Sequence, residues 1–422
     1  MEGWKSKPLS EVCQFINRGI SPAYIEVGGV AVLNQKCVRD HAVNFDLGRR
    51  HNAAVKKVTS DRFVRSGDVL VNSTGTGTLG RVAQLREDPP ELTTVDSHVT
   101  IVRPTKGLFY PEFFGYALIA IEEQIQQGGE GCGGQTELSR AKLADGYVVS
   151  FPTNLNDQRR IVAILDEAFE GIATAKANAE KNLRNARELF ASRMQVLFGP
   201  DEAWDRVQLA ELLARGWITS HLDGNHGSDY PRKEEFVDAG VPYIAARAIK
   251  GGAVDFDEVK YLSVERAASI RKGLAKDRDV LFAHNATVGP VAILSTNEDV
   301  VILGTSLTYY RCNQKHIHPE YLAHFMVSPA FTSQYAQVMK QSTRNQVPIT
   351  KQREFFHVIP PIDVQWRIAD DLDDLSIQTG RLADIGTRKI AALDQLKKSL
   401  LHQAFTGQLT AKSTDKQLEA VA

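Results

Sequence analysis

The chain has 422 residues, of which 43% are hydrophobic and 24% are charged, and its formal net charge is −1. This composition is typical of folded globular proteins and excludes a disordered, collagen-like or disulfide-scaffold chain, while the length predicts two to four domains. Because the net charge is close to zero, any affinity for a polyanion has to come from local patches.

The N-terminal sequence is polar and lacks the basic and apolar regions of an export signal. The longest apolar stretch, 108–121, is shorter than the roughly 20 residues needed to span a bilayer. The four cysteines lie far apart without a Cys-x-x-Cys pair, so we expect reduced thiols and no structural zinc site. The sequence therefore predicts a soluble, cytoplasmic protein.

In chain order, short runs of β-branched and aromatic residues predict strands, and two segments that begin with Pro-Glu predict helices. A much longer helix is expected after each group of these elements. The strands are expected at 30–33, 68–71, 99–102, 280–283 and 307–310, and the shorter helices at 111–127 and 319–340. The predicted organisation is a mixed α/β domain over 1–157, a first spacer helix over 158–198, a second α/β domain over 199–357, a second spacer helix over 358–411 and a tail over 412–422.

The two halves of the chain repeat one another. Ala-Val-Asn-Phe-Asp at 42–46 recurs as Ala-Val-Asp-Phe-Asp at 253–257, and Asp-Val-Leu at 68–70 recurs at 279–281, both 211 residues later. Gln158-Arg-Arg-Ile matches Gln365-Trp-Arg-Ile in the same order along the chain. This period is far longer than that of a solenoid, so the sequence predicts two tandem copies of a domain-sized unit.

From Gln158, and again from Gln365, apolar residues recur in steps of four and three. This heptad pattern predicts two helices of about 40 residues, roughly 60 Å long, with a narrow seam that has to be buried against another helix. The expected partner is the other long helix, in an antiparallel coiled coil; the alternative is that each helix packs on its own globular domain. The residues expected at this helix and subunit interface are Ile161, Leu165, Ile172, Leu183, Phe190, Leu197, Ile368, Leu372, Leu375, Leu382, Leu393 and Leu400.

Two polar, glycine-rich stretches occur in the first half. The stretch 72–80 resembles a phosphate-binding loop, but it lacks Gly-Lys-Ser/Thr, and its counterpart 284–289 has lost most of the glycines. We therefore expect a tight surface turn there. The stretch 128–134 leads into Gln135, and its counterpart leads into Gln346. Such a loop suits insertion into a groove, and it is equally typical of an ordinary linker.

Basic residues are concentrated at equivalent places in the two halves. Residues 36–65 contain eight lysines and arginines against three acids, and residues 247–278 contain eight against five. Lys36 corresponds to Arg247 and Arg39 to Lys250 at the same spacing of 211. Such patches contact phosphates in nucleic-acid-binding proteins, and the alternative is a solvated face without a partner.

Catalytic motifs are missing from the sequence. It contains no adenine-methyltransferase Asn/Asp-Pro-Pro-Tyr/Phe loop, Gly-x-Ser-x-Gly elbow, His-Glu-x-x-His pair or Walker A motif. The eleven histidines are scattered, so we expect neither a catalytic nor a metal site.

With this duplicated order, the chain resembles the specificity subunits of type I restriction-modification systems over 1 to about 410. The resemblance is carried by the end of each half, where a strand leads through a short polar link to Gln158-Arg-Arg-Ile or Gln365-Trp-Arg-Ile, with Phe198 or Phe405 near the helix end, and by the Gly-Asp-Val-Leu strand at 67–70. The family's Pro-Pro-Leu-x-Glu-Gln is altered before both glutamines, and the first half lacks the second proline.

The resemblance implies a non-catalytic subunit in which two target recognition domains read the halves of a bipartite, asymmetric DNA target and the helices set the gap. It also implies two modification subunits that use S-adenosylmethionine, restriction subunits that use ATP and Mg²⁺, and no cofactor in this chain. Base readout requires polar side chains on loops that face the groove. The candidates are Lys36, Arg39, Arg49, Arg50, Lys56, Ser73, Thr74, Thr76 and Gln135 in the first half, and Arg247, Lys250, His284, Asn285, Thr287, Arg344, Asn345 and Gln346 in the second.

Two other functions remain open from the residues alone. One is a self-sufficient DNA-modifying enzyme with an unrecognised active site. The other is a coiled-coil scaffold whose globular domains bind protein and not DNA.

Overall fold

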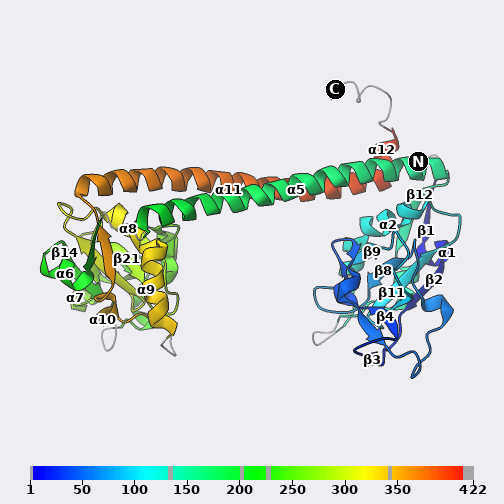
Figure 1. The fold of residues 1–422 in the computed structure, drawn as a ribbon, viewed down its shortest axis with the longest axis horizontal. Helices are drawn as coiled ribbons and strands as arrows, with labels where there is room; N and C mark the ends of the chain where they lie inside the picture. Colours follow the sequence, from blue (N-terminus) through cyan, green and yellow to red (C-terminus); the bar gives the residue numbers. More distant parts are fainter. Residues whose placement is uncertain (1–2, 132–135, 200–203, 225–229, 341–344, 412–422) are drawn as a thin grey trace. The chain divides into compact units, whose positions relative to one another are not determined.

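The computed structural model describes residues 3–131, 136–199, 204–224, 230–340 and 345–411. The chain divides into two compact units, the first formed by Met1–Ala179 with Arg388–Ala422 and the second by Glu180–Thr387 (Figure 1). Each unit therefore contains one sheet region and a part of both long helices. Among the described residues, no helix is long and apolar enough to cross a membrane.

The first unit is built on two four-stranded sheets. One is antiparallel throughout, in the order β2-β11-β8-β9, and the other has the order β10-β4-β7-β3, with β10 parallel to β4. Two strand pairs, β1 with β12 and β5 with β6, complete the unit. The strands are β1 (Trp4–Pro8), β2 (Cys13–Arg18), β3 (Tyr24–Ile25), β4 (Val30–Leu33), β5 (Val38–Arg39), β6 (Ala42–Val43), β7 (Arg49–His51), β8 (Val69–Asn72), β9 (Val82–Gln84), β10 (Thr93–Val95), β11 (Val99–Pro104) and β12 (Val148–Pro152).

The second unit repeats this topology. Its antiparallel sheet has the order β14-β24-β21-β22, and its other sheet, β15-β19-β16-β23-β20, gains one edge strand. The duplication predicted from the sequence is therefore confirmed strand by strand. The strands are β13 (Asp205–Gln208), β14 (Ile218–Asp223), β15 (Phe236–Val237), β16 (Val241–Ile244), β17 (Ile249–Lys250), β18 (Ala253–Val254), β19 (Lys260–Leu262), β20 (Leu274–Ala275), β21 (Val280–Ala283), β22 (Val291–Ile293), β23 (Val301–Leu303), β24 (Leu307–Cys312) and β25 (Phe356–Ile359).

The helices expected over 111–127 and 319–340 are each divided in two. α2 (Pro111–Ala120) and α3 (Glu122–Gln127) are separated at Ile121, and α8 (Pro319–Val327) and α9 (Pro329–Lys340) are separated at Ser328, where the following proline disfavours a helical conformation. α2 and α8 pack against the antiparallel sheets. The shorter helices are α1 (Leu9–Val12), α4 (Arg140–Asp145), α6 (Leu209–Ala214), α7 (Val264–Ser269), α10 (Ile349–Gln352) and α12 (Gln408–Ala411).

Two helices of 44 residues each, α5 (Leu155–Phe198) and α11 (Ile362–Phe405), follow the sheet regions. Val358 and Ile359, which the sequence assigns to the second spacer helix, instead end strand β25. In each unit a segment of α5 lies beside a segment of α11 (Figure 1). Lys176 pairs with Asp394 at 2.8 Å in the first unit, and Arg193 pairs with Asp371 at 2.6 Å in the second.

The pairing of the helices is antiparallel within each unit. In the first unit Ile161 and Leu165 share a core with Leu401 and Ala404, and in the second Met194 and Phe198 share a core with Leu372. The start of one helix thus packs near the end of the other, so the predicted antiparallel pair is confirmed. The predicted seam residues that are buried or half-buried are Ile161, Leu165, Ile172, Leu183, Phe190, Leu197, Ile368, Leu372, Leu375, Leu393 and Leu400.

Leu382 is the exception, because 54% of its surface is exposed. After Leu375 the seam advances by two steps of four, to Thr379 and then to Ala383, which is half-buried. A straight helix has 3.6 residues per turn, so apolar residues spaced by a strict heptad, at 3.5 per turn, drift slowly around the helix surface. Steps of four, four and three residues bring the apolar positions back to the face that meets the other helix. The prediction that Leu382 lies in the seam is therefore wrong by one position.

A buried glutamine fixes the start of each long helix. Gln158 accepts a hydrogen bond from the Tyr110 amide at 2.8 Å and donates to the carbonyls of Pro152 and Leu108 at 2.8 and 3.3 Å. Gln365 repeats these contacts with His318, Pro360 and His316 in the second unit. The repeated Gln-x-Arg-Ile sequence therefore attaches each helix to the turn before the Pro-Glu helix.

Replacing Gln158 by leucine is expected to destabilise the first unit by about 2–4 kcal/mol, because it leaves buried backbone groups without partners. Urea unfolding, with hydrogen exchange to assign the change to a unit, measures the effect. Gln195→Leu, on an exposed face of the same helix, is the matched control. An equal and small effect of both variants would show that the contacts of Gln158 are energetically unimportant.

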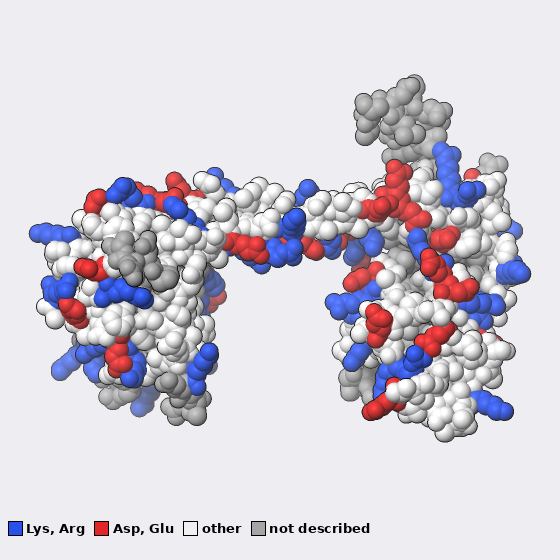
Figure 2. All heavy atoms as spheres, in the orientation of Figure 1, with Lys and Arg blue, Asp and Glu red and all other residues white. Residues whose placement is uncertain are grey.

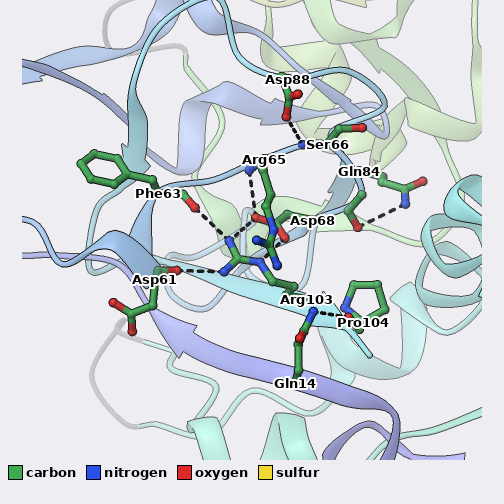
Figure 3. Close-up of polar contacts among 11 residues, drawn as sticks. Gln14, Asp61, Phe63, Arg65, Ser66, Asp68, Gln84, Asp88, Arg103 and Pro104 are labelled. Carbon is green, nitrogen blue, oxygen red and sulfur yellow. Dashed lines mark hydrogen bonds and ion pairs between the residues drawn. The ribbon is translucent and has the colours of Figure 1, made fainter. Parts of the chain in front are cut away.

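A buried ion pair joins Asp68, which directly precedes β8, to Arg103 on β11 in the first sheet (Figure 3). Both carboxylate oxygens of Asp68 accept from Arg103, at 2.6 and 2.7 Å, and Arg103 also donates to the carbonyls of Asp61 and Phe63. Asp68 in turn accepts from the Arg65 amide at 3.0 Å. In the second unit Asp279 and Arg311 form the same bidentate pair at 2.9 and 2.7 Å. The repeated Asp-Val-Leu sequence thus marks a structural contact.

Candidate nucleic-acid interface

In the first unit the structure brings together two loops that are far apart in the sequence. The turn between β8 and β9 contains Ser73, Thr74 and Thr76, and it pairs with the segment 136–138 that precedes α4. Thr74 and Glu137 form an isolated antiparallel bridge, and the Leu138 amide donates to the Ser73 carbonyl at 2.8 Å. Gln135 lies outside the described residues.

The second unit has the same pair of loops. Asn285 and Gln346 form the equivalent bridge, and the Val347 amide donates to the His284 carbonyl at 2.8 Å. Asn345 also donates to the Ala286 carbonyl at 2.5 Å. Arg344 lies outside the described residues. We refer to the two loops of each unit, 73–80 with 136–138 and 284–289 with 345–347, as the paired loops.

The paired loops present hydroxyl and amide groups to solvent. Thr76, Thr287 and Asn345 are exposed, and Thr74, Asn285 and Gln346 are half-buried. Amide and hydroxyl side chains can donate to and accept from the edges of bases, so their chemistry fits base contact.

Ser73 and His284 are different, and the prediction that they contact bases is not supported by their burial. Ser73 is fully buried, and its hydroxyl is hydrogen-bonded to Thr100 Oγ1 at 2.5 Å. His284 is 3% exposed, and its Nδ1 lies 3.1 Å from the Val347 carbonyl. Both side chains therefore hold the loops in place. Residue type alone did not show that these positions, which directly follow buried strands, face inward.

His98 is a candidate that sequence reasoning missed. It is exposed at the turn between β10 and β11, and its Nδ1 is hydrogen-bonded to Thr74 Oγ1 at 2.6 Å. The Ser73 amide donates to its carbonyl at 2.8 Å. The signal available was a polar turn, Asp96-Ser-His, between two apolar strands, but the distance of 24 residues from Thr74 hid the contact.

Lys36 is the predicted basic residue whose chain neighbour, Gln35, is hydrogen-bonded to the residues around the loop 73–80. It lies on a 3₁₀ helix, η1 (Gln35–Cys37), whose first turn is capped by Asn34. Asn72 donates to the Gln35 carbonyl at 3.0 Å, and Thr78 lies 3.4 Å from the Gln35 side chain. The exposed lysine therefore adjoins the loop 73–80, where it can reach a phosphate.

The four other predicted basic residues of the first unit have partners within the chain. Arg39 is exposed beside Asp40 at 3.6 Å. Arg49 lies over the Tyr24 ring at 3.5 Å, and Arg50 is paired with Glu91 at 2.5 Å. Lys56 donates to the Ser21 carbonyl at 3.1 Å. Arg49 and Arg50 belong to β7 of the second sheet, so the predicted patch is divided between two parts of the unit.

In the second unit the two leading basic candidates are neutralised by nearby acids. Lys250 pairs with Asp255 at 2.9 Å and with Glu258 at 3.3 Å, and Arg247 lies 3.8 Å from Glu258. The hydrogen bonds that Lys250 donates to Asp255 and Glu258 raise its pKa. Figure 2 shows acidic side chains among the basic ones on the visible face of each unit. Two of the five acids counted in the segment 247–278 therefore lie directly against its two leading basic candidates.

A buried polar network lies beneath the paired loops of the second unit. Gln352 is fully buried, and its Oε1 lies 3.0 Å from the Tyr310 hydroxyl, which donates to it, and 3.1 Å from His221 Nε2. Its Nε2 donates to Thr308 Oγ1 at 3.1 Å and to the Val347 carbonyl at 3.2 Å. His357, also fully buried, packs beside the Tyr310 ring.

Burial lowers the pKa of both His221 and His357 to about 4. An unfolded histidine has a pKa near 6.5, so between about pH 6.5 and 4 the unfolded chain binds protons that the folded unit does not. The second unit is therefore expected to lose stability as the pH falls through this window, by about 2 kcal/mol per histidine at pH 5.

Tryptophan fluorescence in urea can follow this loss, since Trp204, Trp217 and Trp366 lie in the second unit and Trp4 alone lies in the first. His357→Val is the matched variant, because Val149 holds the equivalent position on β12. It is expected to remove the contribution of one histidine, about 2 kcal/mol at pH 5, from the pH dependence. A midpoint that does not change between pH 7 and 5 would contradict the account.

Within the described ranges, no three His, Cys, Asp or Glu side chains are placed to hold a metal ion.

The chain is similar in sequence and in fold to proteins of type I restriction-modification systems. No protein-family model matches it. Residues of the chain are 23% identical over 174 positions to the Type I restriction enzyme EcoBI specificity subunit of Escherichia coli, a match that covers 41% of this chain and 36% of that protein's length. A solved chain from work on complex assembly and conformational transition of the type I R-M system superposes with a TM-score of 0.73 at 17% identity, covering 96% of this chain and 98% of the other.

The HsdS subunit from Thermoanaerobacter tengcongensis superposes with a TM-score of 0.57 at 18% identity, covering 96% of this chain and 97% of that one. The chain therefore has the fold of these two solved chains along nearly its whole length. The resemblance to type I specificity subunits that its repeated motifs indicate is confirmed.

Proposed function

We propose that this chain is the DNA-binding specificity subunit of a type I restriction-modification complex. In this function each unit reads one half of an asymmetric, bipartite duplex target, and the chain itself carries no catalytic site. The observation that supports it best is the duplication: both units keep the same sheet order and the same paired loops, and both long helices pass through both units. The likeness in fold to the HsdS subunit and the sequence similarity to a type I specificity subunit agree with this proposal.

Base reading is assigned to the paired loops. They carry exposed groups that both donate and accept hydrogen bonds, and the major groove presents a distinct pattern of such groups for each base pair. Lys36 beside the first pair of loops supplies a phosphate contact, which positions the unit without reading sequence. The two pairs of loops share a threonine at Thr76 and Thr287 and differ at the bridge, where Thr74 and Glu137 stand in place of Asn285 and Gln346, as expected if the two units read different bases.

The spacing between half-sites is assigned to the long helices. A helix of 44 residues extends over roughly 66 Å at 1.5 Å per residue, which is about two turns of duplex DNA. Two recognition units joined by one rigid spacer bind with a high effective concentration, so two modest half-site affinities combine into a high affinity for the correctly spaced pair.

The partners proposed are double-stranded DNA, two modification subunits and restriction subunits. The modification subunits would bind S-adenosylmethionine and methylate adenine after flipping the base out of the duplex, and the restriction subunits would use ATP and Mg²⁺. The long helices would dock the modification subunits.

Purified chain and purified complex distinguish this function from the alternatives. The chain alone should bind duplex DNA with an affinity that falls steeply with salt, and it should neither methylate nor cleave DNA. Methylation should require the modification subunits. Methylation or cleavage by the chain alone would establish a self-sufficient enzyme, and the absence of DNA affinity with and without the partner subunits would favour a protein-binding scaffold.

A further inference from the structure

The paired loops of the two units are anchored through the same backbone atom by different side chains. In the first unit Arg18 donates to the Leu138 carbonyl at 2.7 Å. In the second unit Gln352 donates to the Val347 carbonyl at 3.2 Å, and His284 Nδ1 lies 3.1 Å from the same oxygen. Leu138 and Val347 are equivalent, because the amide of each donates to the carbonyl of the residue that follows the central strand, Ser73 or His284.

Neither anchor has a counterpart in the other unit. In the first unit Arg18 on β2 lies opposite Thr100 on the neighbouring strand β11. Thr308 on β24 is equivalent to Thr100, and the residue opposite it on β14 is Asp223. The position of Gln352 in the short helix before the last strand is held in the first unit by Leu143, which is buried in the apolar core. The duplicated fold has therefore kept the backbone path of the loop and changed the side chain that fixes it.

The surroundings of the two anchors differ in the same way. Arg18 is 27% exposed, and it also pairs with Glu137, the residue before its anchored carbonyl, at 2.5 Å. The side-chain oxygen of the buried Gln352 is hydrogen-bonded to the Tyr310 hydroxyl and to His221 Nε2. In the first unit the register of β2 with β11 places Ile16 and Val102 where the second unit has His221 and Tyr310. The loop of the first unit is thus held by a partly exposed charged side chain, and the loop of the second unit by a buried network of neutral polar side chains.

We propose that Arg18 and Gln352 are positioning residues for half-site reading. Each donates to the carbonyl at the end of the paired-loop bridge, and so helps to set where Thr74 and Thr76, or Asn345 and Gln346, face the groove. Because the two anchors are independent, each half of the target is read through its own anchor. This inference rests on the proposed function and adds which residues control each half-site.

The test uses the full chain with its partner subunits in a host in which the wild-type gene is first shown to confer one split methylated motif. Arg18→Met should raise methylation at sites with one substituted base in one half by at least about tenfold, with the other half unchanged, because correct hydrogen-bond geometry at a base is worth a factor of this size. Gln352→Leu should relax the opposite half. Arg86→Met and Gln334→Leu, which remove contacts away from the loops, should leave both halves unchanged.

A loss of stability alone would lower methylation of the whole motif without relaxing either half. This outcome separates a folding defect from a loss of base discrimination.

Arg18→Lys keeps one donor and should retain discrimination between bases in its half-site. The triple variant His221→Ile, Tyr310→Phe, Gln352→Leu removes the orphaned polar groups together and should fold more stably than Gln352→Leu while its half-site stays relaxed. Full fidelity in the triple variant, no relaxation in either single variant, or relaxation of the same half by both would overturn the proposal. If the wild-type gene confers no split motif, the proposed function itself fails.

Discussion

Replacing Arg103 by methionine is expected to destabilise the first unit by about 3–5 kcal/mol, because it leaves the carboxylate of Asp68 buried without its charged partner. The same change removes the hydrogen bonds that Arg103 donates to the carbonyls of Asp61 and Phe63. These contacts join β11 to the segment that leads into β8, its neighbour at the centre of the sheet. Urea unfolding should show the loss, and hydrogen exchange should assign it to β8 and β11.

Two further variants make the Arg103 experiment specific. Arg86→Met breaks the exposed pair with Asp166 and should cost no more than about 1 kcal/mol. Asp68→Asn combined with Arg103→Met removes the uncompensated charge and should recover part of the loss, which a double-mutant cycle measures. If Arg103→Met and Arg86→Met lower the free energy of unfolding by the same amount, the buried pair does not stabilise the sheet.

Shortening both long helices by seven residues is expected to shorten the gap between the half-sites by about 3 base pairs. The removed segments are 180–186 of α5 and 381–387 of α11, which lie opposite one another in the antiparallel pair. Seven residues are close to two turns, or about 10.5 Å, so each seam stays in phase to within about 20°. About 10 Å of duplex corresponds to about 3 base pairs.

The spacer experiment is read by sequencing methylated DNA from a host that carries the shortened chain and its partner subunits. Both half-site sequences should be retained, since neither pair of loops is altered. Circular dichroism should show that the helices have been shortened and not unfolded. Selection of the original gap by the shortened chain would contradict the assignment of the helices as spacer.

The sequence predicts the architecture well because each element has a local signal. The duplicated Gln158 and Gln365 mark the helix starts, and the buried contacts of both side chains explain why the same residue recurs. The fold class and the antiparallel pairing follow from the repeat and from the long seams. The single misplaced seam residue, Leu382, shows that the spacing of apolar residues gives the face of a helix only as accurately as the assumed period.

The candidate interface is less predictable, since it depends on which side chains meet after folding. Ser73 and His284 have suitable chemistry for base contact but are buried, because they follow strands whose other residues form the core. Lys250 is basic, yet Asp255 and Glu258 fold against it and offset its charge. His98 reaches Thr74 only through the packing of two sheet strands. A sequence gives residue types, whereas direction and partner come from tertiary structure.

The central claim is that two repeated units read two separate parts of one duplex target. Sequencing of methylated DNA from the host with and without this gene tests it most directly. Deletion of the gene is expected to remove adenine methylation from one asymmetric motif made of two short specific parts separated by a fixed number of unspecified base pairs. An unchanged set of methylated motifs, or the loss of a single continuous motif, would contradict it.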